Sequence, residues 1–287
     1  MNVNFFIVGA PKSGTTSLYK YLDQHEDICM SSIKEPNYFS SEELNRQDLY
    51  YKSKVVSNID SYKKLFVKKK DKQILGEASV SYLFYKNVAE KIVAYNKKAK
   101  IIIILRNPVE RAYSHYLMDY RLGYVKVSLD EILNNSISKN YLLFYQQYIE
   151  LGLYYNQVKR YIDVFGKENV CVKLYDELNE DNRSFTNNII SFLNLELQEN
   201  IDFTLPYNKS KSAKNSFIQN LYSFSFLRKL ISILSPNFII RFINKKFFNQ
   251  KSQIISGTLE NKLRDLYSED IRLLEKMLDL DLSSWRK

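Results

Sequence analysis

Short apolar runs alternate with longer amphipathic segments along most of the chain. The apolar runs predict strands near residues 4–8, 28–31, 73–77, 100–105 and 169–174. Polar and apolar positions at helical spacing predict helices near residues 14–24, 60–69, 87–96, 108–122, 128–137, 153–165, 183–193, 216–234 and 258–279. This order of elements predicts an α/β fold, with a central parallel sheet of about five strands covered by helices on both faces and a helical C-terminal part.

The length of the chain fits one domain. A chain of 287 residues can bury a large single core, and we expect residues 1–287 to form a single domain. In a parallel sheet of this kind, ligands bind beyond the carboxyl ends of the strands. The residues that follow each strand are therefore the first place to look for chemistry.

The first strand runs into a glycine-framed loop, Gly9-Ala10-Pro11-Lys12-Ser13-Gly14, and then into a helix. Glycines let such a loop curl its N–H groups inward, and a helix N-terminus adds partial positive charge, so the loop predicts a phosphate cradle of P-loop type. A nucleoside triphosphatase has a lysine directly after the second glycine, where this chain has Thr15. The lysine of this loop is Lys12 instead, which favours a phosphate-like ligand other than ATP.

A second anion site is predicted after the buried strand near 100–105. That strand is followed by Arg106, where a P-loop nucleoside triphosphatase often has a magnesium-binding aspartate. Pro108 suits the first turn of the next helix, which carries Ser114. We expect Arg106 and Ser114 to converge on a second phosphate, with an ion pair between Arg106 and Glu110 as the alternative.

Taken together, these motifs resemble those of the sulfotransferase family, in its heparan-sulfate or carbohydrate-type branch. The family uses 3′-phosphoadenosine 5′-phosphosulfate (PAPS). The matching segments, in chain order, are GAPKSGTTSL at 9–18, KEPNYF at 34–39, GEASVSY at 76–82 and LRNPVERAYSHY at 105–116. Residues 172–178 resemble the strand-to-helix segment of the family, and residues 259–285 resemble its closing helix. The resemblance implies PAPS as cofactor, 3′,5′-ADP as product and no required metal.

The resemblance also implies which residues bind the cofactor. They lie in the loop, after the strand near 100–105, in the strand-to-helix segment and in a basic loop near 207–214: Pro11, Lys12, Ser13, Gly14, Thr15, Thr16, Ser17, Arg106, Ser114, Tyr175, Lys209, Ser210 and Lys211. Alternatives without a role in cofactor binding stay open. Lys12 could be a solvated loop lysine, and Ser13 could be a helix N-cap.

Three residues are the catalytic candidates. Lys12 is expected to stabilise the negative charge that grows on the leaving phosphate. The resemblance places the general base at Glu35, beside Lys34, and a surface glutamate is the alternative. His115 is the second candidate base, although a structural role is favoured for it. For Glu77 we keep three alternatives: orienting a loop group, binding substrate, or forming a structural salt bridge.

Charge is concentrated in one stretch. Residues 203–259 carry nine Lys and Arg and no Asp or Glu, in a chain of net charge +10. Within it, a helical segment rich in aromatic and basic residues at about 215–252 could contact an anionic membrane surface or polymer, or simply pack with a solvated basic face. Because no nucleic-acid reading motif accompanies this charge, we expect no nucleic-acid partner.

Other features place the protein among cytoplasmic enzymes. The two cysteines have no disulfide or metal-ligand spacing, and neither a signal peptide nor a membrane span is expected. The predicted location is cytoplasmic, with peripheral contact at the inner membrane surface left open. The oligomeric state is not indicated.

The function predicted is sulfonate transfer from PAPS to a hydroxyl or amine of a carbohydrate by in-line displacement. A lipid or small-molecule alcohol is the alternative acceptor. A P-loop nucleotide kinase or a non-catalytic anion-binding module is the alternative of another class.

Overall fold

The computed structural model describes residues 2–47, 55–67, 70–71, 73–135, 138, 141–204, 212–213, 248–249 and 255–287. Its strands are β1 (Phe5–Gly9), β2 (Ile28–Met30), β3 (Ile74–Ala78), β4 (Lys100–Leu105), β5 (Val170–Leu174), β6 (Ser212–Ala213) and β7 (Phe248–Asn249). Its α-helices are α1 (Thr15–Leu22), α2 (Ser41–Gln47), α3 (Ile59–Lys63), α4 (Val88–Tyr95), α5 (Pro108–Arg121), α6 (Leu129–Asn134), α7 (Leu142–Tyr148), α8 (Tyr154–Phe165), α9 (Tyr175–Glu180), α10 (Asn182–Phe192) and α14 (Gly257–Leu278).

By contacts, the chain divides into two compact units. The first comprises residues 1–108, 153–208 and 267–287, and the second comprises residues 109–152 and 209–266. Neither unit is one continuous segment, and two of the four chain boundaries fall inside α5 and α14. The single domain expected from the sequence stays a prediction.

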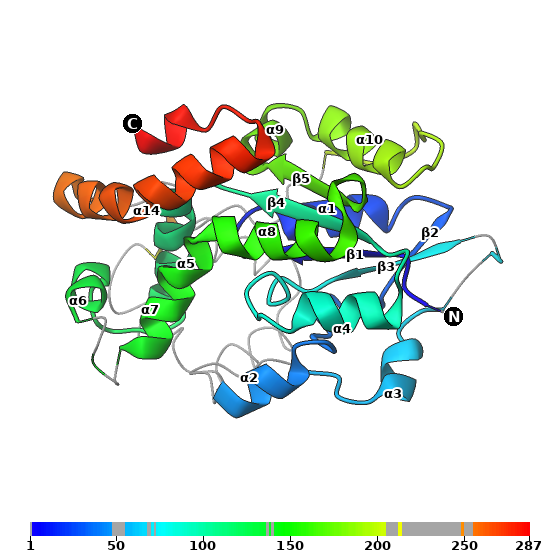
Figure 1. Ribbon diagram of the computed structural model, residues 1–287, viewed down its shortest axis with the longest axis horizontal. Coiled ribbons are helices and arrows are strands. Elements are labelled where there is room, and N and C mark those ends of the chain that lie inside the picture. Colours follow the sequence, from blue (N-terminus) through cyan, green and yellow to red (C-terminus); the bar gives the residue numbers. More distant parts are fainter. Residues whose placement is uncertain are drawn as a thin grey trace. The chain divides into compact units, whose positions relative to one another are not determined.

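The first unit is built on a five-stranded parallel sheet of order β2-β3-β1-β4-β5, which confirms the predicted fold (Figure 1). β1 lies between β3 and β4, with Ile7 paired to Ala78 and to Ile102. Parallel strands end at the same edge, so the segments after β1, β3 and β4 are neighbours there.

Helices cover both faces of this sheet (Figure 1). One face packs on α1 and α10 through an aliphatic core that includes Phe5, Ile7, Ile102, Ile104, Leu18 and Ile189. The other face, which α4 and α8 cover, is rich in aromatic rings. The Phe39 ring lies at the centre of these rings. Its centroid is 5.3 to 5.8 Å from the ring centroids of Phe6, Tyr62, Tyr82 and Tyr95.

Long helices agree with the predicted ones, whereas three short helices were not predicted. These are α2, α7 and α9, of six or seven residues each. The helix predicted at 216–234 lies outside the described residues, and so does the rest of the basic segment at about 215–252 apart from β7. Among the described helices, none is long and apolar enough to span a membrane.

The second unit contains a buried polar cluster between α5 and α7. Arg111 has no exposed surface and donates to the backbone carbonyls of Gln147 and Tyr148. Asp119 accepts from the Tyr148 hydroxyl at 3.0 Å. These bonds tie α5 to α7.

Candidate active site

The loop after β1 has the backbone that an anion cradle needs. Lys12 and Gly14 have positive φ angles of 70° and 82°, so the chain reverses direction within three residues. Helix α1 then begins at Thr15, and Gly14 is its N-cap with no side-chain cap. No side chain therefore caps the first N–H groups of α1.

Ser13 does not cap the helix, so the N-cap alternative for this residue is wrong. It precedes the N-cap Gly14 by one residue, and its side chain is buried. Its Oγ has no hydrogen-bond partner among the described residues. A buried hydroxyl without a partner is unfavourable, and a bound acceptor would relieve it.

Arg106 and Tyr175 join the loop from the ends of β4 and β5. Arg106 donates to the Lys12 carbonyl at 3.3 Å, and its guanidinium lies 4.7 Å from the centre of the Tyr175 ring. A side chain added at Gly14 would approach the same ring to 3.1 Å. The structure thus brings together Lys12, Gly14, Arg106 and Tyr175, four of the residues predicted to bind the cofactor.

Local bonds fix the junction of β5 and α9, where Tyr175 lies. Glu177 accepts from the backbone N–H of Leu174 at 2.9 Å and pairs with Lys173 at 2.7 Å. This pairing closes the turn between β5 and α9, which is where Tyr175 lies.

Glu35 lies in a loop at the same sheet edge. Its backbone N–H donates to the carbonyl of Ala78, the last residue of β3, at 2.8 Å. Its side chain is 40% exposed and forms an ion pair with Lys34, which is 19% exposed. A carboxylate accessible to this degree can meet an acceptor from solution.

Glu77 is fully buried and is surrounded by hydroxyl groups rather than by a cation. Its Oε1 accepts from Ser79 at 2.6 Å and its Oε2 accepts from Tyr62 at 2.5 Å; the Tyr82 hydroxyl is a third partner. Burial raises the pKa of the Glu77 carboxyl to about 7, and the three hydroxyls oppose that rise. The salt bridge that the sequence left open is not among the described ion pairs.

Ser114 and His115 belong to the second unit, on α5. His115 is buried, and its Nδ1 lies 3.1 Å from the Gln147 carbonyl, with Nε2 3.7 Å from Asp119. Both ring nitrogens thus face groups of the cluster between α5 and α7. Ser114 is half-buried on the same helix.

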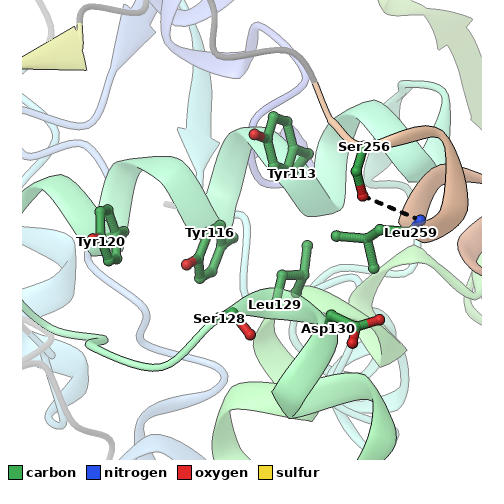
Figure 2. A pocket seen from close by; sticks show the side chains of 8 residues that line it. All are labelled: Tyr113, Tyr116, Tyr120, Ser128, Leu129, Asp130, Ser256 and Leu259. Carbon is green, nitrogen blue, oxygen red and sulfur yellow. Dashed lines mark hydrogen bonds between the residues drawn. The ribbon is translucent and has the colours of Figure 1, made fainter.

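Another face of α5 lines a pocket of about 360 Å³, shown in Figure 2. Three tyrosines at helical spacing, Tyr113, Tyr116 and Tyr120, stack in a row with ring centres 6.4 and 5.7 Å apart. The rest of the lining comes from Ser128, Leu129, Asp130, Ser256 and Leu259. None of these residues was singled out from the sequence; the tyrosine spacing at i, i+3 and i+7 was the available signal.

Three predicted cofactor ligands, Lys209, Ser210 and Lys211, lie outside the described residues. Among the residues that the structure does describe, no cluster of His, Cys, Asp and Glu could hold a metal ion. The predicted absence of a metal stays a prediction.

Comparisons with known proteins agree with the motifs. The sulfotransferase domain family matches residues 3–269. A sulfotransferase of known structure from Alicyclobacillus acidocaldarius is 30% identical, with a TM-score of 0.72 and full coverage of both chains.

Other relatives match only parts of this chain and of their own length. Carbohydrate sulfotransferase 15 of Mus musculus is 25% identical over 67% of this chain and 44% of its own length. The membrane-associated sulfotransferase kil1 of Dictyostelium discoideum is 37% identical over 39% of this chain and 22% of its own. The chain thus spans less than half the length of these relatives.

The family match covers both compact units and all four motifs described above. It confirms the resemblance predicted from the sequence and the prediction of an enzyme of the sulfotransferase class. The chain belongs to the sulfotransferase family.

Proposed function

We propose that the protein transfers a sulfonate group from PAPS to a hydroxyl or amine of a carbohydrate. The observation that carries this proposal is the convergence of Lys12, Arg106 and Tyr175 around the loop after β1. The buried hydroxyl of Ser13 in this loop has no hydrogen-bond partner among the residues that the structure describes. The loop offers N–H groups and cations to an anion, and the tyrosine adds an aromatic face.

The residues present fit such a nucleotide. Ser13 Oγ needs a hydrogen-bond partner, which an anionic oxygen could supply. Thr15 stands where a triphosphate-binding loop has its lysine, which argues against ATP. When bound, PAPS would supply the sulfonate and leave as 3′,5′-ADP.

The loop residues Pro11, Lys12, Ser13, Gly14, Thr15, Thr16 and Ser17 would hold the 5′-phosphosulfate. Arg106 would hold the 3′-phosphate, since its planar guanidinium matches phosphate oxygens. Ser114 is assigned to the same phosphate by its motif alone. Lys209, Ser210 and Lys211 stay proposed ligands from the basic loop.

Two residues have proposed chemical roles. Lys12 would stabilise the oxygen that becomes negative as the S–O bond breaks, which lowers the barrier because that charge grows in the transition state. Glu35 would take the proton of the acceptor hydroxyl, and its exposed, ion-paired carboxylate suits that role. His115 is the less favoured base, since both its ring nitrogens face buried groups of its own unit.

A carbohydrate acceptor is supported by the names of the relatives. They include carbohydrate sulfotransferase 15 and a heparan sulfate N-deacetylase/N-sulfotransferase of Xenopus laevis. The pocket of the second unit, with its tyrosine faces and a carboxylate, has the amphipathic lining that a sugar ring favours. A lipid alcohol remains the second candidate acceptor. Peripheral membrane contact of a cytoplasmic enzyme is also proposed, and the name of kil1, a membrane-associated sulfotransferase, supports that contact.

Calorimetric titration with 3′,5′-ADP, 5′-AMP and ATP tests the proposal. We expect the tightest binding for 3′,5′-ADP. Arg106→Ala should weaken that binding by about 1.5–3 kcal/mol, the scale of a charge-assisted contact, and leave 5′-AMP almost unchanged.

Arg183→Ala is the matched control, because Arg183 also stacks on an aromatic ring, that of Phe203 at 5.1 Å, but on α10. It should leave all three affinities unchanged. Equal weakening of 3′,5′-ADP and 5′-AMP by Arg106→Ala would refute the 3′-phosphate assignment, and a preference for ATP would favour a kinase.

A further inference from the structure

The backbone of the loop that carries Glu35 is not fixed by local hydrogen bonds alone. Glu35 and Asn37 both have left-handed φ angles, 61° and 53°, although neither is glycine. Such residues persist only where the surrounding structure fixes them. Local bonds contribute one restraint, the Asn37 side chain donating to the Glu35 carbonyl at 2.9 Å.

Other restraints come from the segment after β3. The backbone N–H of Asn37 donates to Ser79 Oγ at 3.1 Å, and the backbone N–H of Phe39 donates to the Tyr82 hydroxyl at 3.1 Å. Each hydroxyl is at the same time bonded to the buried carboxylate of Glu77. The backbone N–H groups of Asn37 and Phe39 are thus linked to one carboxylate, each through a single hydroxyl.

The carboxylate sets the direction of both bonds. A hydroxyl has one proton, and above a pH of about 7 the ionised Glu77 carboxylate only accepts. Ser79 and Tyr82 therefore use their protons on Glu77 and present lone pairs to the two loop N–H groups. A neutral amide at position 77 would bring its own N–H donors, and at least one of the three hydroxyls would lose its acceptor.

We propose that Glu77 is a positioning residue, which holds the Glu35 loop in place by orienting the hydroxyls of Ser79 and Tyr82 toward its backbone. This role rests on the proposed function, in which Glu35 is the base. Because Glu77 has no exposed surface, its effect on turnover would be transmitted through the loop.

Hydrogen exchange of Glu77→Gln tests the role directly. The change keeps the size of the side chain and removes its charge. Protection of the Asn37 and Phe39 amides should fall by about tenfold or more, as expected when a charge-assisted bond is weakened. The amides of Ile102 and Ile103 lie within the paired strand β4 and report global stability. Their protection should keep the order of magnitude that it has in the wild-type protein.

Asp270→Asn is the matched control. Asp270 is another carboxyl whose pKa burial raises, to about 6, and it accepts from the backbone N–H of Tyr155 at 3.1 Å. Its replacement should lower global stability without a selective loss of exchange protection at the Asn37 and Phe39 amides. Ser79→Ala should expose the Asn37 amide alone, and combined with Glu77→Gln it should add nothing further there.

Turnover is measured with PAPS and desulfated heparan-type polysaccharide. Glu77→Gln should lower kcat by about tenfold or more, since a misplaced base loses rate, while KM for PAPS stays within about twofold. Unchanged protection at Asn37 and Phe39 would overturn the proposal. Glu35→Gln in parallel separates the two claims: if it keeps full turnover the proposed base is wrong, while the exchange data still decide whether Glu77 holds the loop.

Discussion

At the scale of single residues, the candidate site divides into groups the sequence could indicate and groups it could not. Lys12 and Arg106 follow strands within recognisable motifs, so their approach to one edge was predictable. The surroundings of Glu77 were not predictable. Its hydroxyl partners come from α3 and from the turn after β3, and no local pattern shows that three hydroxyls replace a cation.

Lys12→Ala should lower turnover by roughly 10²-fold or more, as expected for loss of a group that stabilises the transition state. Binding of 3′,5′-ADP should change only modestly, because the loop N–H groups and Arg106 remain. Steady-state rates and calorimetry of the same preparations check this.

Lys20→Ala is the control for Lys12, since Lys20 is an exposed lysine of α1 that contacts the ring of Tyr19. It should retain turnover. Parallel losses of rate and binding in Lys12→Ala would mean that Lys12 is a ground-state ligand only.

At the scale of elements, strands and long helices were predictable because their apolar periodicity is strong. The missed helices α2, α7 and α9 are too short to show a stripe; α2, for example, buries only Leu44. Contacts between elements were also beyond the sequence. Asp270 of α14 binds the first turn of α8, which has no side-chain cap of its own.

Gly14→Ala tests the junction of β1 and α1. An added Cβ would lie 2.4 Å from Leu178 Cδ2, at a φ of 82° that alanine rarely adopts. We expect unfolding free energy to fall by about 1–3 kcal/mol, the cost of such backbone strain, and 3′,5′-ADP to bind more weakly because the Tyr175 ring is displaced.

Gly257→Ala serves as its control, because a Cβ there meets nothing within 4 Å. Chemical denaturation should find this variant close to wild type. Equal stability of Gly14→Ala and Gly257→Ala would contradict the described loop conformation.

At the scale of the whole molecule, one family match spans two compact units that are both discontinuous in sequence. The alternation of strands and helices was enough to predict the parallel sheet of the first unit. It could not predict the second unit, because that unit is assembled from segments far apart in the chain and its described strands, β6 and β7, have only two residues each. The motifs nevertheless indicated the family, since each of them depends on a few adjacent residues.

Transfer of radiolabelled sulfonate from PAPS tests the central claim most directly. Wild-type protein is incubated with desulfated heparan-type polysaccharide, desulfated chondroitin and an alkyl glucoside, beside Glu35→Gln and the control Glu42→Gln. Glu42 is an exposed carboxylate on α2 that pairs with Lys91 and Arg46.

Wild type and Glu42→Gln should label at least one acceptor at equal rates. Glu35→Gln should keep its affinity for 3′,5′-ADP and lose roughly 10²–10⁴ in rate, because an amide cannot accept the proton. If no acceptor is labelled, sulfonate transfer from PAPS to a carbohydrate is contradicted. If Glu35→Gln keeps more than about a tenth of the wild-type rate, the loss is below the range of general-base effects, and Glu35 is not the base.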